Sequence, residues 1–295
     1  MQHGLISPGI RRGLAVVILV WPLAACETVS STVASLNPFG ASKASSDLTK
    51  DEPAEVLYND GLARLQNKNF EGAAKKFTEI DKQYPYSSWS KRSLLLQTYA
   101  NYENRSYEDA IGAGRRFVQL YPADKDAAYA QYLVGMSYFN QIPDVTRDQE
   151  RSQRALLAMD ELINKWPNSE YVPDARQRVT VARDQLAAKE MDVGRYYLER
   201  RNYPGAVNRF REVISKYQTT RHTEEALMRL TESYMAMGIV PEAQTAAAVL
   251  GHNFPDSPWY KDAYKLLQTG GVEPLENQES TISRLFRTTR RAVGL

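Results

Sequence analysis

Small and large apolar residues recur along this chain at a fixed interval from Ala54 onward. Ala73 and Ala110 are 37 residues apart, as are Ala206 and Ala243, and each follows a short polar turn. Five aromatic residues, each followed by Pro or Gln, close the successive units: Tyr84-Pro85, Tyr121-Pro122, Trp166-Pro167, Tyr217-Gln218 and Phe254-Pro255. A period of this length indicates a stack of repeated supersecondary units, each too small to bury its own apolar face.

The spacing of small and large positions resembles the tetratricopeptide repeat, a helix–turn–helix unit of 34 residues. The matching residues of the first unit are Leu57, Gly61, Ala73, Phe77 and Pro85. The second unit departs with Thr98 in place of glycine, and the fourth departs with Gln218 in place of proline. The resemblance implies an all-α, right-handed α-solenoid of about five repeats over residues 54–268. The alternative is an unrelated helical bundle.

Two units are longer than the rest. The third holds about eight extra residues in the polar stretch Ile142–Glu150, which predicts a loop between helices. The fourth is longer again, and neither Pro nor Gly interrupts Ala175–Val193. We therefore predict one long helix over about 174–200, which separates the N-terminal from the C-terminal repeats and gives two binding surfaces.

The first 26 residues have the pattern of a secretory signal. Arg11 and Arg12 precede the apolar run Gly13–Ala25, which is too short to span roughly 30 Å of hydrocarbon. Leu23-Ala24-Ala25-Cys26 resembles a bacterial lipobox, which implies that Cys26 carries an S-diacylglycerol and an N-acyl group. The alternative is an ordinary secretory signal with a chance cysteine. Glu27 favours the outer membrane over the inner one, on the periplasmic face.

Charge and candidate chemistry narrow the function. Loss of residues 1–25 lowers Lys+Arg from 37 to 35 against 35 Asp+Glu, so the mature chain is neutral and nucleic-acid binding gains no support. His222 and His252 lack metal-ligand spacing, and we expect no catalytic residues, no metal site and no cofactor beyond the covalent lipid.

The final segment has a pattern of its own. Its apolar residues share one helical face, and four arginines follow the last acid, Glu279. The apolar residues are Ile282, Leu285, Phe286 and Val293, and the basic ones are Arg284, Arg287, Arg290 and Arg291. The pattern fits a helix on anionic lipid or in a partner groove, or else a disordered basic tail.

Aromatic residues gather at the helix positions that face ligands in tetratricopeptide repeats. In the first three units these are Tyr58, Leu62 and Leu65, then Leu95, Tyr99 and Tyr102, then Tyr129, Tyr132, Met136 and Phe139. Such a groove suits an extended peptide with aromatic side chains. The alternative is that these tyrosines pack between helices.

The whole arrangement resembles the BamD/ComL family of outer-membrane β-barrel assembly lipoproteins. Matching stretches are Arg147-Asp148-Gln149, Trp166 to Tyr171, Tyr196-Tyr197 and Ala206 to Arg209. The resemblance implies a lipid-anchored periplasmic scaffold whose partners are BamA, other assembly-machine subunits and unfolded outer-membrane proteins. It places BamA docking at Asn208 and Arg209. A general tetratricopeptide lipoprotein adaptor in cell-envelope or polysaccharide export is the alternative.

The resulting organisation has five segments. They are a signal peptide over 1–25, a lipidated tether rich in Ser, Thr and Asn over 26–50, repeats 1–3 with the peptide groove over 51–171, repeats 4–5 with the long helix over 172–268, and a basic tail over 269–295.

Overall fold

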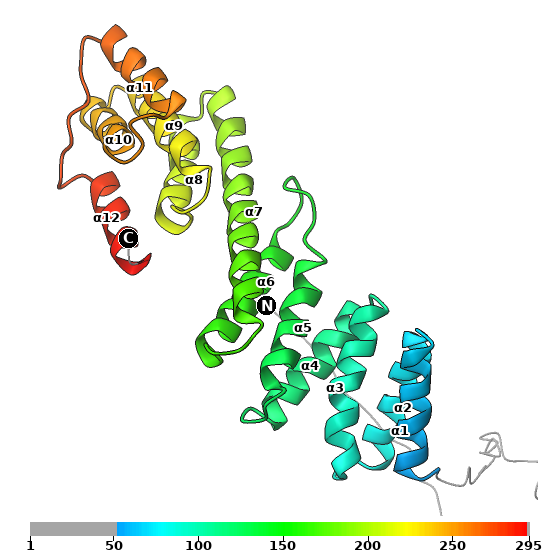
Figure 1. Ribbon diagram of the computed structural model, residues 1–295. Coiled ribbons are helices and arrows are strands. Elements are labelled where there is room, and N and C mark those ends of the chain that lie inside the picture. Colours follow the sequence, from blue (N-terminus) through cyan, green and yellow to red (C-terminus); the bar gives the residue numbers. More distant parts are fainter. Residues whose placement is uncertain (1–51, 294–295) are drawn as a thin grey trace, which may run out of the picture. The chain divides into compact units, whose positions relative to one another are not determined.

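The computed structural model describes residues 52–293, with side chains up to Arg287, and every regular element in this range is a helix (Figure 1). The helices are α1 (Ala54–Gln66), α2 (Phe70–Gln83), α3 (Ser88–Glu103), α4 (Tyr107–Leu120), α5 (Ala127–Phe139), α6 (Glu150–Lys165), α7 (Val172–Glu199), α8 (Tyr203–Lys216), α9 (Thr223–Ala236), α10 (Val240–Asn253), α11 (Pro258–Thr269) and α12 (Thr281–Val293). The all-α prediction is confirmed. None of the described helices is long and apolar enough to cross a membrane.

From α1 to α11 each helix packs on the next, and the contacts have the order of a repeat array (Figure 1). The pairs α1/α2, α3/α4, α5/α6, α7/α8 and α9/α10 form five helix–turn–helix repeats, and we call the first helix of each pair helix A and the second helix B. Among the first four repeats, helix A also contacts helix A of the next repeat, as α3 does with α1 and α5. The predicted stack of repeats is therefore observed, and α11 covers its C-terminal end against α9 and α10.

A small residue opposite a large one sets the approach of the two helices in three repeats. A Cβ on Gly61 would lie 2.6 Å from Cε1 of Phe77, and one on Gly194 would lie 2.4 Å from Cε1 of Phe210. The third repeat pairs a glycine with Met159 in the same way. The buried rings of Phe77 and Phe210 cannot move aside, so only glycine permits the helix crossings of the first and fourth repeats, whereas Met159 presents the flexible end of its side chain.

In the second repeat, Thr98 stands where the first, third and fourth repeats have glycine, and a smaller residue on the facing helix compensates for it. Gly114 stands where the first and fourth repeats have Phe77 and Phe210, and a Cβ on it would lie 3.0 Å from Cγ2 of Thr98. The fifth repeat follows the same arrangement, since Thr231 and Ala247 occupy the corresponding positions and both are buried. In these two repeats the larger residue of the pair is on helix A and the smaller one on helix B, the reverse of the first and fourth repeats. The pair still fills the space between the two helices.

The turns between helices A and B share one backbone geometry. Four repeats place a left-handed residue two positions after the end of helix A: Lys68, Arg105, Arg201 and Gly238, with φ of 57°, 60°, 58° and 74°. Side-chain caps then start several helices, as when the Asn69 and Asn202 side-chain oxygens accept the amide hydrogens of Gly72 and Gly205. These caps satisfy amides that the first helical turn leaves without partners.

The long helix and the long loop are both observed, and they support each other. Helix α7 spans Val172–Glu199, against the predicted 174–200, and residues 140–149 connect α5 to α6. The loop lies against α7, because Gln185 Nε2 donates to the Pro143 carbonyl and Lys189 Nζ donates to the Thr146 carbonyl, both at 2.9 Å. The extra residues of the third repeat therefore pack on the extra turns of the fourth.

The C-terminal segment forms helix α12, which packs on α8 and α10 (Figure 1). Ile282 and Phe286 are buried in one apolar cluster with Leu230 and Tyr234. Disorder is therefore wrong for residues 281–293, and the chain itself covers Ile282 and Phe286 of the apolar face proposed for lipid or a partner. Gln218 stands where the other four repeats have proline. Its side-chain Nε2 donates to the backbone carbonyls of Leu285 and Phe286, at 3.3 and 3.2 Å.

Candidate partner-binding surfaces

Five tyrosines from α3, α5 and the residue before α7 lie close together, and we call them the tyrosine cluster: Tyr99, Tyr102, Tyr129, Tyr132 and Tyr171. The Tyr171 ring lies 5.2 Å from that of Tyr129 and 5.0 Å from that of Tyr132, the latter pair stacked. All five side chains are half-buried, so each ring keeps part of its surface in solvent.

A polar edge borders the tyrosine cluster. Tyr132 donates its hydroxyl hydrogen to Oδ2 of Asp174 at 2.8 Å, and Arg178 pairs with the same carboxylate at 3.2 Å. The Arg178 guanidinium also lies 4.9 Å from the ring centroid of Phe139. Tyr102 accepts a hydrogen bond from the side-chain amide of Asn140 at 3.1 Å. These contacts hold the rings in position and leave apolar faces beside fixed polar groups.

The ionisation states in the tyrosine cluster suit hydrogen bonding. Burial raises the pKa of Tyr129, and the nearby Tyr99, Tyr171 and Glu103 add to the effect. Burial, followed by the hydrogen bond to Asp174, raises the pKa of Tyr132. Burial acts against ionisation of Asp174, but hydrogen bonds from Arg178 and Tyr132 lower its pKa overall. Tyr129 and Tyr132 therefore present neutral phenols at neutral pH, and a phenol hydroxyl can donate or accept a hydrogen bond.

The structure brings only part of the predicted groove into this cluster. Tyr58 instead packs at 4.9 Å from Trp89 and 5.9 Å from Phe77, between ring centroids. Leu62 and Leu65 pack on the same first-repeat core, and Leu95 packs on the apolar cluster around Phe117. Phe139 packs on the apolar cluster around Tyr138, and Met136 is buried. A ligand role for these side chains stays a prediction.

Asn208 and Arg209, the predicted docking pair, are exposed on α8. Arg209 Nη1 donates to Oε2 of Glu190 on α7 at 3.1 Å, so the guanidinium is held over the junction of the two helices. Both residues line a hollow of about 430 Å³ together with Tyr197, Asn202 and Glu212. The hollow combines one arginine, carboxylates and amides, which suits a polar protein interface.

Sequence reasoning missed four members of these surfaces. Tyr171, Asp174 and Arg178 complete the tyrosine cluster and its edge, and Glu190 orients Arg209. Asp174 and Arg178 had one available signal, a four-residue spacing at the start of the long helix. Nothing in the chain pattern points to Glu190, because it meets Arg209 only through the packing of α7 on α8.

The candidate metal ligands are scattered over the part of the chain that the structure describes. No group of three or more His, Cys, Asp or Glu side chains in residues 52–293 could hold a metal ion. His222 lies 3.6 Å from Asp184 and serves the contact between α7 and the start of α9. Cys26, the predicted lipid attachment site, lies outside the described residues.

Comparison with known proteins assigns the family. A family model described as "YfiO: Outer membrane lipoprotein" matches residues 50–250. The outer membrane protein assembly factor BamD of Caulobacter vibrioides is 45% identical over 235 residues, covering 80% of this chain and 77% of that protein. The same factor of Rickettsia prowazekii is 41% identical, covering 73% of this chain and 86% of its own length. That of Neisseria meningitidis serogroup A is 33% identical, with 74% and 85% covered. The chain therefore belongs to the YfiO family of outer membrane lipoproteins, the non-enzymatic family of the outer membrane protein assembly factor BamD.

Proposed function

We propose that this outer membrane lipoprotein is a periplasmic scaffold of the β-barrel assembly machine, with two separate partner surfaces. The tyrosine cluster of repeats 1–3 receives the C-terminal targeting strand of unfolded outer-membrane proteins. The α7–α8 junction around Asn208 and Arg209 docks the POTRA domains of BamA. Cys26 carries the lipid that anchors the chain.

The tyrosine cluster is the observation that carries the client-binding part of the proposal. Its rings offer apolar area to an extended strand that ends in an aromatic residue, and an aromatic pair adds about 0.5–1.5 kcal/mol beyond its buried area. The neutral hydroxyls and the amide of Asn140 supply polar partners for the strand's backbone. Half-buried, mutually packed rings also lose little conformational entropy when a ligand binds.

Loss of one cluster ring is expected to weaken client binding. In Tyr129→Ala, a fluorescent ten-residue peptide ending in phenylalanine should bind about five- to thirtyfold more weakly, since a central aromatic contact is typically worth about 1–2 kcal/mol. Fluorescence anisotropy with the full mature chain measures the Kd. Tyr196→Ala is the matched control, because Tyr196 is an exposed tyrosine of α7 outside the cluster. Equal Kd values for both folded variants and the wild type would reject the tyrosine cluster as the client site.

Reversal of charge at Arg209 is expected to weaken BamA capture. Arg209→Glu places a carboxylate beside Glu190 and removes the donor that faces the 430 Å³ hollow, and we expect at least tenfold less BamA in affinity purification from detergent-solubilised envelopes. Arg154→Glu is the control, because its side chain is similarly exposed, 46% against 44%, and also pairs with one glutamate. Equal losses in the two variants would remove Arg209 from the docking site.

A further inference from the structure

Helix α12 occupies the groove between two B helices, α8 and α10, and packs on both of them (Figure 1). Its buried Ile282 and Phe286 share one apolar cluster with Leu230 and Tyr234 of α9, the helix A of the same repeat as α10. The chain therefore shows that a groove between neighbouring B helices can hold an amphipathic helix. The same groove occurs two repeats earlier, between α4 and α6, where none of the described segments fills it.

The α4–α6 groove is a hollow of about 570 Å³ between the B helices of repeats 2 and 3. The two grooves can be aligned on the small positions of their repeats: Ala110 with Ala206, Gly135 with Thr231, and Ala155 with Ala243. The corresponding wall and floor residues are then Pro122 and Gln218, Val134 and Leu230, Arg154 and Glu242, and Leu157 and Thr245. The α4–α6 groove shares no residue with the tyrosine cluster or with the hollow around Arg209.

Two residues of α10 hold the chain just before α12. Glu242 accepts the Ser280 hydroxyl hydrogen at 2.6 Å, and Thr245 Oγ1 accepts the Asn277 amide hydrogen at 3.3 Å. In the α4–α6 groove the counterpart of Thr245 is Leu157, whose side chain is 68% exposed, whereas Thr245 is fully buried. An apolar side chain is therefore uncovered at the position that an incoming segment covers in repeat 5.

Three arginines converge on the buried ring of Tyr138, which stands at the position of Tyr234. The guanidinium carbons of Arg115, Arg151 and Arg154 lie 5.5, 5.8 and 5.9 Å from the centroid of this ring. Arg115 and Arg154 also line the α4–α6 groove. Positive charges this close to one another repel unless anions lie among them.

The described residues neutralise only part of this charge. Arg151 pairs with Glu108 at 2.8 Å and Arg154 pairs with Glu150, whereas no acid within residues 52–287 forms an ion pair with Arg115. The three arginines thus face two carboxylates. One positive charge beside the groove is left for an anionic group of a partner.

The seat of α12 carries the opposite sign at one contact. Glu242 binds Ser280, which directly precedes α12, and the helix continues with Arg284 and Arg287. In the α4–α6 groove Arg154 stands at the position of Glu242. A segment docked there in the same way would meet a guanidinium instead of a carboxylate, so it should begin with an acidic residue.

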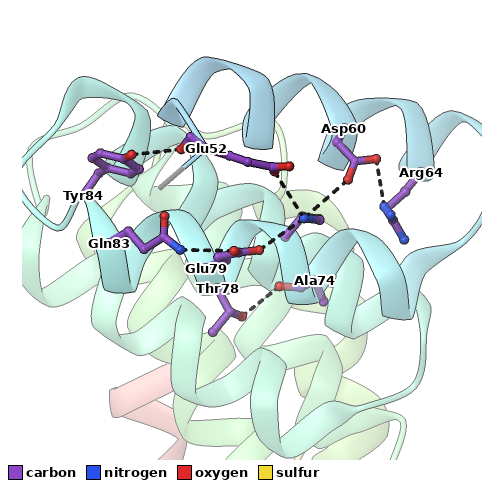
Figure 2. A network of polar contacts seen from close by, with 9 residues as sticks. Glu52, Asp60, Arg64, Ala74, Thr78, Glu79, Gln83 and Tyr84 are labelled. Carbon is purple, nitrogen blue, oxygen red and sulfur yellow. Dashed lines mark hydrogen bonds and ion pairs between the residues drawn. The ribbon is translucent and has the colours of Figure 1, made fainter. Parts of the chain in front are cut away.

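The neighbouring hollow between α2 and α4, of about 890 Å³, has the opposite charge. Its charged lining residues are four acids and two lysines: Glu71, Glu79, Glu108, Asp109, Lys75 and Lys82. Figure 2 shows polar contacts within its α2 wall, where Gln83 Nε2 donates to Glu79 and the Thr78 hydroxyl donates to the Ala74 carbonyl. The charged lining residues of the α4–α6 groove are instead three bases and one acid: Arg115, Arg154, Lys165 and Glu161. An acidic segment is therefore attracted to the α4–α6 groove and repelled by its neighbour.

We propose that the α4–α6 groove docks an amphipathic helix of a partner protein, and that a carboxylate opens this helix. In α12, large apolar residues follow Ser280 after two and six positions, at Ile282 and Phe286. The partner helix has this spacing with aspartate or glutamate in the place of Ser280. Aspartate starts a helix as well as serine does, so the exchange keeps the helix cap.

Each part of the groove has a role in this docking. Arg154 and Arg115 bind the opening carboxylate through charge-assisted hydrogen bonds, and Leu157 is covered by the apolar face of the helix. The inference is independent of client and BamA binding, since the α4–α6 groove shares no residue with either proposed surface.

Binding of a synthetic helix tests the proposal in the full mature chain. The probe is a fluorescent peptide with the sequence of residues 277–289 that carries Ser280→Asp, Arg284→Glu and Arg287→Glu. The unchanged peptide is the matched control, because it keeps the same apolar residues, and its own seat is already filled by α12. We expect fluorescence anisotropy to give a Kd for the acidic probe that is at least tenfold lower than that for the control. Equal values would overturn the proposal.

Reversal of the two groove arginines should exchange this preference. For Arg115→Glu with Arg154→Glu, we expect the acidic probe to bind at least tenfold more weakly than to the wild type and the unchanged peptide to bind more tightly. The matched variant is Arg92→Glu with Arg176→Glu, because both arginines are exposed and lie outside the groove, on α3 and α7. Thermal unfolding checks that both variants are folded. The same Kd of the acidic probe for the two variants would place its binding elsewhere and overturn the proposal.

Three further results would also overturn it. Undiminished binding of an acidic probe with Ile282→Ser and Phe286→Ser would show that charge alone is recognised. Phosphatidylglycerol vesicles that bind the wild type but not Arg115→Glu with Arg154→Glu, and that displace the acidic probe, would make lipid the occupant. Dimers of the mature chain in analytical ultracentrifugation that dissociate when the acidic probe is added would make a second copy the occupant.

Discussion

Gly194→Thr is expected to destabilise the protein by about 2–3 kcal/mol, and the loss is expected to be recovered in part by a second substitution on the facing helix. A Cβ at Gly194 would lie 2.4 Å from Cε1 of Phe210, whose ring is fully buried. The ring has no free space, so α7 and α8 must separate, which is the usual cost of overpacking a core.

Phe210→Ala alone should cost about 3–5 kcal/mol, because it leaves a cavity where the ring was. The double variant Gly194→Thr with Phe210→Ala recreates the pairing that this chain uses at Thr231 and Ala247. Its loss should be smaller than the sum of the single losses by at least about 2 kcal/mol, since the threonine fills part of the cavity.

Urea unfolding of the three variants, followed by circular dichroism, measures the three free energies. Simple additivity would contradict the inference that small and large partners exchange helices between repeats. Gly112→Thr serves as a control for glycine replacement itself, because a Cβ there meets no atom within 4 Å. It should leave stability within about 0.5 kcal/mol of the wild type.

Ile282→Asp is expected to release helix α12 from the C-terminal repeats. Ile282 is fully buried in the cluster that includes Leu230, Tyr234 and Phe286. An unpaired carboxylate at this position would cost several kcal/mol, more than the docked helix of the variant still gains from burying Phe286, at about 1.5–3 kcal/mol. Undocking should therefore be preferred, and it would expose apolar surface on α8 to α10.

Hydrogen–deuterium exchange over residues 281–293 measures the release, together with the thermal unfolding temperature. Leu275→Asp is the matched control, because it makes the same kind of change seven residues earlier at a side chain that is 68% exposed. Protection of α12 in Ile282→Asp equal to that in Leu275→Asp would show that α12 is not held by its apolar face.

Much of the fold follows from chain pattern alone. The repeat period predicted the helix pairs, and the uninterrupted stretch after Ala175 predicted α7 to within two residues at its start and one at its end. The resemblance to the BamD/ComL family is confirmed, and with it the outer-membrane location and the non-enzymatic function. Local patterns of this kind are readable because helix period and turn residues act over short sequence distances.

The candidate surfaces were predictable only in part. Tyr99, Tyr102, Tyr129 and Tyr132 lie on neighbouring helices, because α3 contacts α5. Position within a repeat did not distinguish these rings from Tyr58, which packs on Trp89 and Phe77 inside the first repeat. How far each ring is buried depends on the size of its neighbours on other helices.

The sequence by itself determined the repeat architecture, the family and the chemical character of each helix, since these depend on spacing and composition. Only the tertiary structure decided three further points: that α12 returns to cover α8 and α10, that Glu190 orients Arg209, and that Tyr171 stacks on Tyr132. Each depends on residues that are distant in the chain and meet only after packing. The helical period of a sequence predicts which face of a helix is apolar and which is polar. The residues that contact that face depend on how the repeats pack.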